Sequence, residues 1–223
     1  RRDRAEHRRP AAVVAPRRHG VRVSERAGHA VVLLAAGSST RLGQPKQLLR
    51  RDGETLLRRA ARSALETGPE VLLVVLGSNR SVYQAALQDL PYETVINENA
   101  ASGMASSLQA AASHVAGHAQ VLVLVSDQPA LSTAHLQCLL EGARRSRSGC
   151  AATRLQGLAG VPAVVPGDWF DALPQHAANA GFRARLRALA DDALLLLPAG
   201  GLELDIDTPQ DLAHARALGL LDP

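Results

Sequence analysis

VVLLAAGSSTRLGQPKQLL, residues 31–49, joins an apolar run to a loop of Gly, Ser and Thr that also contains Arg41 and Lys46. A run rich in Val and Leu predicts a buried β-strand, and Gly and Ser allow the turn that follows it. The backbone N–H groups and hydroxyls of such a loop can bind oxyanions, and two cations add to the attraction. The stretch therefore predicts a strand followed by a phosphate-binding loop, or, in the simpler interpretation, a loop that only turns the chain.

Lys46 is the single lysine among the 25 basic residues of the chain. An ammonium group is a compact point charge, whereas the guanidinium of arginine is a planar fork. Keeping a lysine here, in a chain that otherwise uses arginine, indicates a role that depends on its shape or hydration. The loop is neither a Walker A loop nor a dinucleotide fingerprint, because the spacing of Gly37 and Gly43 fits neither motif.

Strand and helix patterns alternate along the rest of the chain. The expected strands are residues 30–35, 71–76, 93–96, 120–125, 161–165 and 194–197. The expected helices are residues 54–67, 79–89, 103–116, 132–147 and 208–219, with a further turn or helix within 167–189. This order predicts the α/β class, with a single Rossmann-like, doubly wound, mostly parallel sheet.

The basic character of the chain belongs to its beginning. Residues 1–29 contain nine of the 25 basic residues and three of the 21 acidic ones, which leaves 16 basic and 18 acidic residues in the remainder. We therefore expect an Arg-rich disordered extension over residues 1–29 and one domain over 30–223. The mildly acidic domain, with only 2% aromatic residues, argues against nucleic acid as a partner.

The cysteines and the hydropathy pattern bear on the location of the protein. Cys138 and Cys150 have neither a CxxC spacing nor a histidine at metal-ligand spacing, so they are expected to be reduced thiols, as in the cytoplasm. No apolar run approaches the roughly 18 residues of a membrane span. We expect a cytoplasmic protein without a membrane partner.

Polar residues follow several of the expected strands, where α/β sheets bind their ligands. Asp127 follows the strand at 120–125, and Asp205 and Asp207 lie on one face of an extended segment. Three carboxylates would suit Mg²⁺. In the alternative interpretation Asp127 caps a helix, while Thr208-Pro209-Gln210-Asp211 starts the last helix as N-cap, Pro at N1 and acidic N3.

The segment INENAASGMASSLQAA, residues 96–111, contains Asn97, Gly103, Ser106 and Ser107 around an expected helix start. Helix N-termini offer free N–H groups to anions, although a serine there can equally be an ordinary N-cap. Met104, the single methionine, is expected to fill a gap in packing.

The run LAAGSSTRLGQPKQLL resembles the signature of the molybdenum cofactor cytidylyltransferase-like (MobA-like NTP transferase) family. That signature has LAAG or LAGG, a short Ser/Gly loop, Arg-Met-Gly, then Lys and Leu-Leu; Leu42 stands here in place of Met. The Ala35-Ala36-Gly37 form resembles the branch that uses CTP. Asp127-Gln128-Pro129 and DIDTPQDL, residues 205–212, are similar to the Asp-x-Pro and DIDTPEDL motifs of the family.

The resemblance implies an enzyme that transfers CMP from CTP to a phosphorylated acceptor such as molybdopterin and releases pyrophosphate, with Mg²⁺ as cofactor. Arg41 and Lys46 would hold the triphosphate, and Asp127, Asp205 and Asp207 would bind the metal. The implied nucleotide-binding residues are Leu34, Ala35, Ala36, Gly37, Ser38, Ser39, Gly103, Ser106 and Ser107. The implied acceptor residues are Asn97, Pro162 and Arg185.

The acceptor half departs from the family pattern. Family members often have Gly-His-Pro where this chain has Gly160-Val161-Pro162, and the run at 181–185 lacks their acidic residue. Two alternatives therefore stay open. One is nucleotidyl transfer to a sugar or polyol phosphate, because methylerythritol phosphate cytidylyltransferases share LAAG and PKQ-like features. The other is a non-catalytic nucleotide-binding accessory protein with a maturing molybdoenzyme as its partner.

Overall fold

The computed structural model describes residues 28–77, 80–173 and 181–223. The strands are β1 (His29–Leu34), β2 (Arg50–Arg51), β3 (Glu54–Thr55), β4 (Val71–Leu76), β5 (Glu93–Ile96), β6 (Gln120–Val125), β7 (Cys150–Leu155), β8 (Leu158–Pro166) and β9 (Leu194–Pro198). The α-helices are α1 (Leu56–Leu65), α2 (Arg80–Ala86), α3 (Met104–Val115), α4 (Thr133–Arg145), α5 (Arg183–Arg187) and α6 (Pro209–Ala217). Short 3₁₀ turns are η1 (Lys46–Leu48), η2 (Ala100–Ser102) and η3 (Gly167–Trp169).

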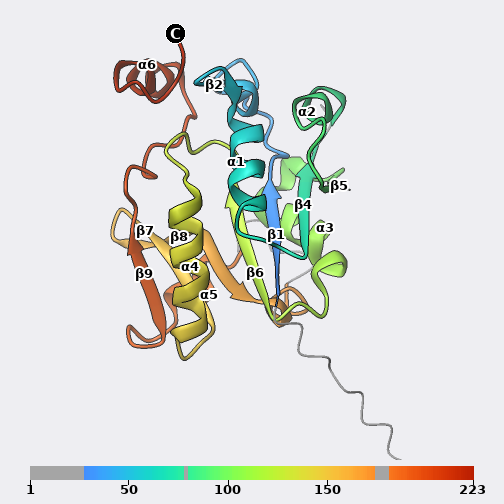
Figure 1. The fold of residues 1–223 in the computed structure, drawn as a ribbon, viewed down its shortest axis with the longest axis vertical. Coiled ribbons are helices and arrows are strands. Elements are labelled where there is room, and N and C mark those ends of the chain that lie inside the picture. The colour runs from blue at the N-terminus through green and yellow to red at the C-terminus, as the bar shows by residue number, and fades with distance from the viewer. Residues whose placement is uncertain (1–27, 78–79, 174–180) are drawn as a thin grey trace, which may run out of the picture.

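Seven strands form one sheet in the order β5-β4-β1-β6-β8-β7-β9 (Figure 1). β1, β4, β5 and β6 are parallel, and β8 is antiparallel to both of its neighbours, β6 and β7. The chain winds outward from β1 in one direction and then in the other, as in doubly wound sheets. The predicted α/β fold with a mostly parallel sheet is confirmed.

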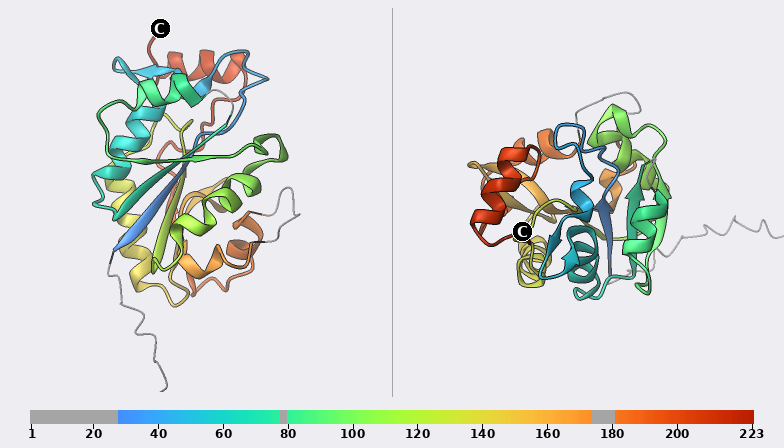
Figure 2. Two further views of the ribbon diagram at one scale, coloured as in Figure 1. Left: turned by 90° about the vertical axis from the view of Figure 1, so that its right-hand side faces the viewer. Right: turned by 90° about the horizontal axis from the view of Figure 1, so that it is seen from above.

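The sheet is buried on both faces because its strands alternate between two hydrophobic clusters. Val31 and Leu33 of β1 belong to the cluster under α1 and α4, whereas Val32 and Leu34 belong to the cluster under α3. The two layers of helices are visible on either side of the sheet in Figure 2. Burial on both faces explains why the strands are nearly continuous runs of Val and Leu.

The register of the central strands brings their carboxyl ends level. Leu34 pairs with Val75 on one side and with Val125 on the other. The loops that follow β1, β4 and β6 therefore leave the sheet at one edge, where ligands of such folds bind. Since β8 runs the opposite way, it contributes its starting residues, near Gly160, to the same edge.

The C-terminal segment closes over this edge. The hydroxyl of Thr208 accepts a hydrogen bond from Asp211 N (3.2 Å), and the Asp211 carboxylate accepts one from Thr208 N (2.8 Å), a capping box that starts α6 with Pro209 at its first position. This confirms the predicted start of the last helix. Leu212 of α6 packs in a small cluster with Leu42 of the glycine-rich loop, so the segment before α6 lies beside that loop.

β7 was not predicted from the sequence. Its residues CAATRL contain Ala, Thr and Arg rather than the Val and Leu of the other strands. It forms a strand because β8 and β9 pair with it on its two sides, which is a tertiary effect that overrides weak local propensity. Within the predicted segment 167–189 the structure has η3 and α5, and residues 174–180 lie outside the described part.

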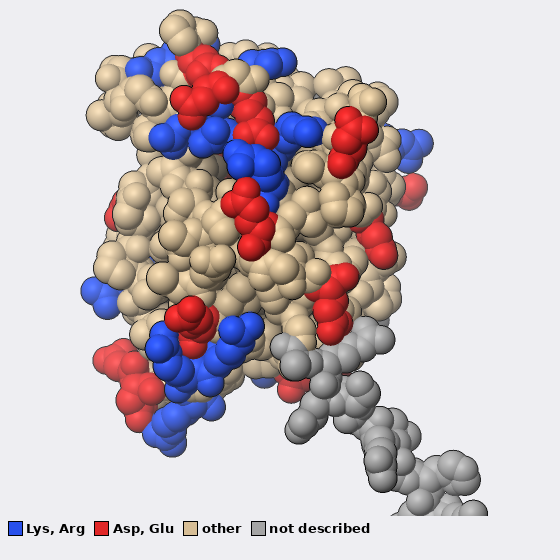
Figure 3. Space-filling model, in the orientation of Figure 1, with Lys and Arg blue, Asp and Glu red and all other residues tan. Residues whose placement is uncertain are grey.

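The predicted extension over residues 1–29 lies outside the described residues except at its end, where His29 is the first residue of β1. Charged side chains intermingle on the face drawn in Figure 3. On α1, for example, Arg58, Arg59 and Arg62 each form an ion pair with Glu54.

Across the described part of the chain, no helix is long and apolar enough to cross a membrane.

Candidate active site

The loop after β1 is held in shape by Gln47, which is 1% exposed. Its amide nitrogen donates to the carbonyls of Gly37 (2.7 Å) and Ala35 (3.3 Å), and its oxygen accepts hydrogen bonds from Ser39 Oγ (3.3 Å) and Tyr83 Oη (3.2 Å). One buried side chain thus fixes both ends of the turn. Gln47 was not among the residues predicted from the sequence, although a polar residue between Lys46 and Leu48 in the PKQLL run was a usable signal.

Ser39 and Gly43 allow the loop to turn back on itself. Both have a positive φ, 52° and 74°, the left-handed region that glycine adopts without strain. The Ser39 hydroxyl accepts a hydrogen bond from Lys46 N (3.1 Å), which offsets the cost of that backbone conformation for a non-glycine residue. The same hydrogen bond joins the start of the loop to Lys46 at its end.

Lys46 lies between two carboxylates that come from distant parts of the chain. Its Nζ forms an ion pair with Asp127 Oδ2, and it donates to Asp207 Oδ1 over 2.8 Å. Arg41 donates to the other oxygen of Asp207 over 2.6 Å. The structure therefore brings together four of the predicted site residues, but both cations contact Asp207 in the arrangement seen here.

The electrostatics of this cluster favour its charged state. Burial by itself would lower the pKa of Lys46, but the charges and hydrogen bonds of Asp127 and Asp207 outweigh it, so that pKa lies above its usual value. The hydrogen bond from Lys46 holds the pKa of Asp207 below its usual value. Near neutral pH the site therefore contains an ammonium and ionised Asp207.

Asp205 has a different environment from Asp207. Although much of the residue is exposed, removal of its carboxyl group from water raises its pKa to about 6, and the nearby charge of Asp127 adds to the effect. Gln128 Nε2 lies 3.5 Å from Asp205 Oδ1 and also donates to the carbonyls of Val161 (3.1 Å) and Leu202 (3.2 Å). Gln128 was named from the sequence only as part of a motif. It connects the loop after β6 with β8 and with the segment 202–205.

The three aspartates suit a divalent cation whose remaining ligands are water and phosphate oxygens. Asp127 Oδ1 is buried and has no hydrogen-bond partner, and an orphaned carboxylate oxygen of this kind is a natural ligand for Mg²⁺ or Mn²⁺. Over residues 28–77, 80–173 and 181–223, however, no three His, Cys, Asp or Glu side chains form a ready metal cluster. The donor set fits an open site, and Lys46 supplies positive charge between Asp127 and Asp207.

A cavity of about 190 Å³ opens beside Asp127. Its lining includes seven of the residues predicted from the sequence: Leu34, Ala36, Gly37, Lys46, Gly103, Ser107 and Asp127. A second cavity of about 490 Å³ adjoins it, because Ala36 and Ala100 line both, and it also contacts Ser38 and Asn97. Loops from the ends of β1, β5 and β6 therefore line two adjacent cavities, whose combined size suits a nucleotide.

Gly77, which was not predicted from the sequence, lines the larger cavity. A Cβ atom at this position would lie 3.0 Å from the carbonyl oxygen of Ala36, so a larger residue would crowd the glycine-rich loop. The signal was a glycine directly after the apolar run of β4. Because Gly77 has no side chain, the cavity stays open between the loops that follow β1 and β4.

Asn97, expected to contact the acceptor, organises the loop that follows β5. Its amide nitrogen donates to the hydroxyls of Ser106 and Ser107 (2.9 Å each), and its oxygen accepts a hydrogen bond from Asn99 N (2.9 Å). Gly103, with φ 96°, makes the turn into α3. Ser107 lies on the 190 Å³ cavity, whereas Ser106 donates to the Gly103 carbonyl (2.8 Å).

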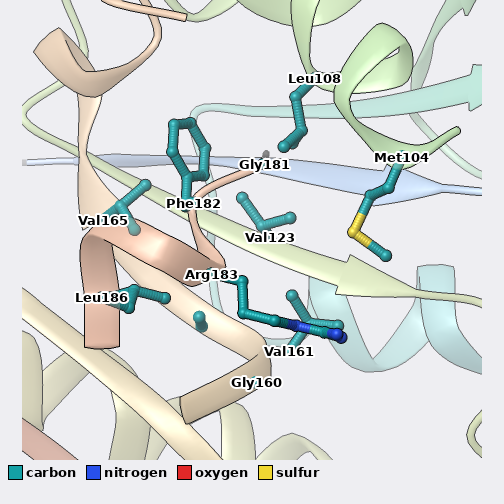
Figure 4. Close-up of a pocket in the computed structure, with 11 residues that line it drawn as sticks. Met104, Leu108, Val123, Gly160, Val161, Val165, Gly181, Phe182, Arg183 and Leu186 are labelled. Carbon is teal, nitrogen blue, oxygen red and sulfur yellow. The ribbon is translucent and has the colours of Figure 1, made fainter. Parts of the chain in front are cut away.

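The remaining predicted acceptor residues do not line these two cavities. The carbonyl of Pro162 accepts a hydrogen bond from Thr153 Oγ1 (2.8 Å) within the sheet. The guanidinium of Arg185 lies 3.9 Å from the ring centre of Trp169. The structure instead places Arg183, two residues before Arg185 in α5, against a separate apolar pocket (Figure 4).

The doubly wound sheet, with a glycine-rich loop and carboxylates at its carboxyl edge, defines the Rossmann-like nucleotidyltransferase fold. A family model described as MobA-like NTP transferase domain matches residues 31–194. The chain belongs to this family, which confirms the resemblance found in the sequence.

Among similar proteins, nicotine blue oxidoreductase of Paenarthrobacter nicotinovorans is 42% identical over 124 residues, 54% of this chain and 60% of that protein. A probable molybdenum cofactor guanylyltransferase of Opitutus terrae is 31% identical over 134 residues, 60% of this chain and 64% of that protein. The chain thus spans less than two thirds of the length of these curated relatives.

Among solved structures, Rv0371c from Mycobacterium tuberculosis has a TM-score of 0.72 and 26% identity, and the alignment covers 84% of this chain and 96% of that one. Another structure of Rv0371c is a complex with manganese, with a TM-score of 0.68, 24% identity and coverage of 84% and 97%.

Proposed function

We propose that the protein is a divalent-metal-dependent nucleotidyltransferase that transfers CMP from CTP to a phosphorylated small-molecule acceptor such as molybdopterin, with release of pyrophosphate. The observation that carries this proposal is the buried, unpartnered oxygen of Asp127 beside Lys46, at the edge of a cavity formed by the glycine-rich loop. Such an oxygen is suited to bind a cation, and the N–H groups of the neighbouring loop are suited to bind an anion. A metal–nucleoside triphosphate complex supplies both.

In the proposed reaction an oxygen of the acceptor phosphate attacks the α-phosphorus of the nucleotide, and pyrophosphate leaves. Because the attacking oxygen is already anionic, no strong general base is needed. Arg41 and Lys46 would move from Asp207 toward the triphosphate and neutralise its charge, while the loop around Gly37 would donate backbone N–H groups. Positioning and charge neutralisation are the usual sources of rate enhancement in phosphoryl transfer.

Mg²⁺ or Mn²⁺, held by Asp127 with Asp205 and Asp207, would offset negative charge on the phosphates. The manganese complex of Rv0371c supports a divalent metal at sites of this fold. The Ala35-Ala36-Gly37 form of the loop favours CTP as the donor. Because one of the relatives is named a guanylyltransferase, GTP is the alternative donor. A maturing molybdoenzyme as partner and a cytoplasmic location stay predictions from the sequence.

The test is a pyrophosphate-release assay with CTP, GTP or ATP, with and without Mg²⁺, across molybdopterin and sugar or polyol phosphates. We expect metal-dependent release of pyrophosphate with CTP. Lys46→Arg should lower the rate by on the order of 100-fold, because the planar guanidinium does not fit the space of the ammonium. Binding of CTP without turnover on any acceptor would favour the accessory-protein alternative. Near wild-type release by Lys46→Arg would contradict the assigned role of Lys46.

A second candidate follows from the relative with 42% identity, which is named an oxidoreductase. A nicotinamide dinucleotide carries a pyrophosphate, so the glycine-rich loop could also accept such a cofactor. Thermal-shift titrations with NADH and NADPH beside CTP distinguish the two. Stabilisation by a reduced dinucleotide alone would favour redox chemistry over nucleotidyl transfer.

A further inference from the structure

The strand β9 lies at one edge of the sheet, far from the candidate active site in the strand order (Figure 1). On its inner side it pairs in parallel with β7, and among the described residues no strand pairs with its outer side. Such an edge presents a row of unpaired N–H and C=O groups, to which another strand can pair. Proteins usually protect their edge strands with charged residues, with Pro or by keeping them short.

The two edge strands of the sheet differ in this protection. β5 has four residues, of which Glu93 is charged and exposed, and Ile96 lines the 490 Å³ cavity. β9 has the sequence LLLLP, without a charged residue, and its single protective residue, Pro198, stands at its end. Leu195 of β9 is 37% exposed, whereas the leucines of the central strand β1 are at most 8% exposed. The single chain therefore leaves an apolar strand edge uncovered.

The pairing with β7 shows which main-chain groups of β9 face outward. Pro198 is the last residue of this ladder, and a proline, which has no N–H, fits a strand where it faces away from the neighbour. At the other end, the Ala193 carbonyl accepts a hydrogen bond from Ser148 N (3.3 Å), so it faces the β7 side. Because the direction alternates along a strand, Leu194 and Leu196 also turn their N–H and C=O groups outward.

The geometry points to a second copy of this chain as the occupant of this edge. We propose a two-fold symmetric dimer in which β9 pairs antiparallel with β9 of the second copy, with the two Leu196 residues opposite each other on the axis. The outward N–H groups of Leu194 and Leu196 then donate to the carbonyls of Pro198 and Leu196 of the second copy. Every outward N–H of β9 thus gains an acceptor, and the same surface serves on both copies, as two-fold symmetry requires.

The side chains of β9 are complementary under the same symmetry. Side chains that lie directly opposite each other in an antiparallel pair share a face of the sheet and pack together. With the axis at Leu196, Leu195 lies opposite Leu197 of the second copy, and Leu194 lies opposite Pro198 of the second copy. Each leucine of the edge therefore meets an apolar residue, and the seven strands of each chain continue into one sheet.

The charges beside β9 favour antiparallel over parallel pairing. Asp191 and Asp192 are exposed just before the strand, and Arg154, also exposed, pairs in register with the last residue of β9. Antiparallel pairing brings the acidic start of one copy to the end of the other copy where Arg154 lies, whereas parallel pairing would align like charges. Among the described residues Asp192 pairs with Arg147 (2.7 Å), while Asp191 and Arg154 form no ion pair.

The test is the mass of the full chain in solution, measured by analytical ultracentrifugation over a range of concentrations. We expect a reversible dimer, with a mass that rises from the 23.5 kDa of one chain toward twice that value. Leu196→Pro removes an outward N–H and leaves the N–H groups that face β7 in place. It should weaken the dimer by about tenfold or more, because symmetry removes this hydrogen bond twice. Leu196→Ala, which also shortens the side chain but keeps the N–H, is the matched control and should weaken the dimer less.

A charge reversal tests the direction of pairing. Arg154→Glu should weaken the dimer several-fold, and adding Asp191→Arg to it should restore most of the affinity, because the two exchanged charges again face each other. Glu93→Arg, at the opposite edge of the sheet, is the control and should leave the dimer unchanged.

The mass of one chain at every concentration, or a dimer that Leu196→Pro weakens no more than Leu196→Ala does, would overturn the proposal. Thermal unfolding verifies that each variant is folded. If Leu196→Pro does not fold, amide hydrogen exchange of the unaltered chain decides the question. Slower exchange of the Leu194 and Leu196 N–H groups at high protein concentration supports the dimer, and exchange that is independent of concentration overturns it.

Discussion

Replacing Lys46 by methionine tests the central contact of the candidate site. The change keeps a long side chain in place and removes the ammonium that pairs with Asp127 Oδ2 and with Asp207 Oδ1 at 2.8 Å. Asp127 would then be a carboxylate in a largely buried position without a counter-charge. We expect Lys46→Met to lower the free energy of unfolding.

The magnitude follows from the exposure of the partners. Removing one member of a fully buried ion pair costs about 3–5 kcal/mol. Here the side chains of Lys46 and Asp127 are 16% and 12% exposed, and that of Asp207 is 38% exposed, so solvent screens part of the loss and roughly 2–3 kcal/mol is expected. For a chain of this length such a loss lowers the melting temperature by about 4–12 °C.

The assay is urea denaturation at pH 7.5, with thermal unfolding in parallel. Arg41→Met is the matched control, because Arg41 pairs with the same Asp207 but is 71% exposed, and such a pair contributes at most about 1 kcal/mol. Adding Asp127→Asn to Lys46→Met should restore most of the stability, since no buried charge is then unpaired. Mg²⁺ should raise the melting temperature of Lys46→Met more than that of the wild type. A free energy of unfolding for Lys46→Met within about 0.5 kcal/mol of the wild type would refute the reasoning, because a change that small is typical of an ordinary surface position.

Three further predictions concern the residues that shape the site. Because the pKa of Asp205 is raised to about 6, its carboxylate form is lost as the pH falls through that value, and calorimetry should show Mn²⁺ affinity declining by up to about tenfold per pH unit below it; in Asp205→Asn that pH dependence should vanish. Gln47→Leu leaves the carbonyl of Gly37 without its donor and should cost about 1–3 kcal/mol in urea denaturation while weakening CTP binding; unchanged CTP affinity would contradict its positioning role. Thr208→Ala removes the N-cap of α6 and should lower the free energy of unfolding by about 1 kcal/mol, as should Ser132→Ala at the N-cap of α4. Only Thr208→Ala should also weaken metal binding, because Thr208 follows Asp207. Equal metal affinities of the two variants would contradict a connection between this cap and the metal site.

Much of the fold could be predicted from the sequence because its signals are local. β1, β4 and β6 are continuous apolar runs, which buried parallel strands require. The capping box at Thr208 was also predictable, since it depends on residues only three positions apart. β7 could not be predicted in this way, because its composition is not that of a strand and its pairing partners lie elsewhere in the chain.

The candidate site shows the same division. The glycine-rich loop, Lys46 and the three aspartates could be chosen as candidates from residue type, spacing and resemblance. The roles of Gln47 and Gln128 could not, because the position of an amide in a motif does not say which carbonyls it meets, and its importance comes from those contacts. Met104 was assigned to packing, yet it lies exposed between two pockets.

The sequence by itself determined that a buried strand ends in a glycine-rich loop, and that acidic residues follow later strands, because hydrophobicity and turn chemistry act over a few residues. Only the tertiary structure decided that Lys46 faces Asp127 and Asp207, which are 81 and 161 residues away in the chain. It also decided that Arg183 rather than Arg185 lines the apolar pocket. Contacts of this range depend on strand register and helix packing, and those are set by the whole core rather than by any single segment.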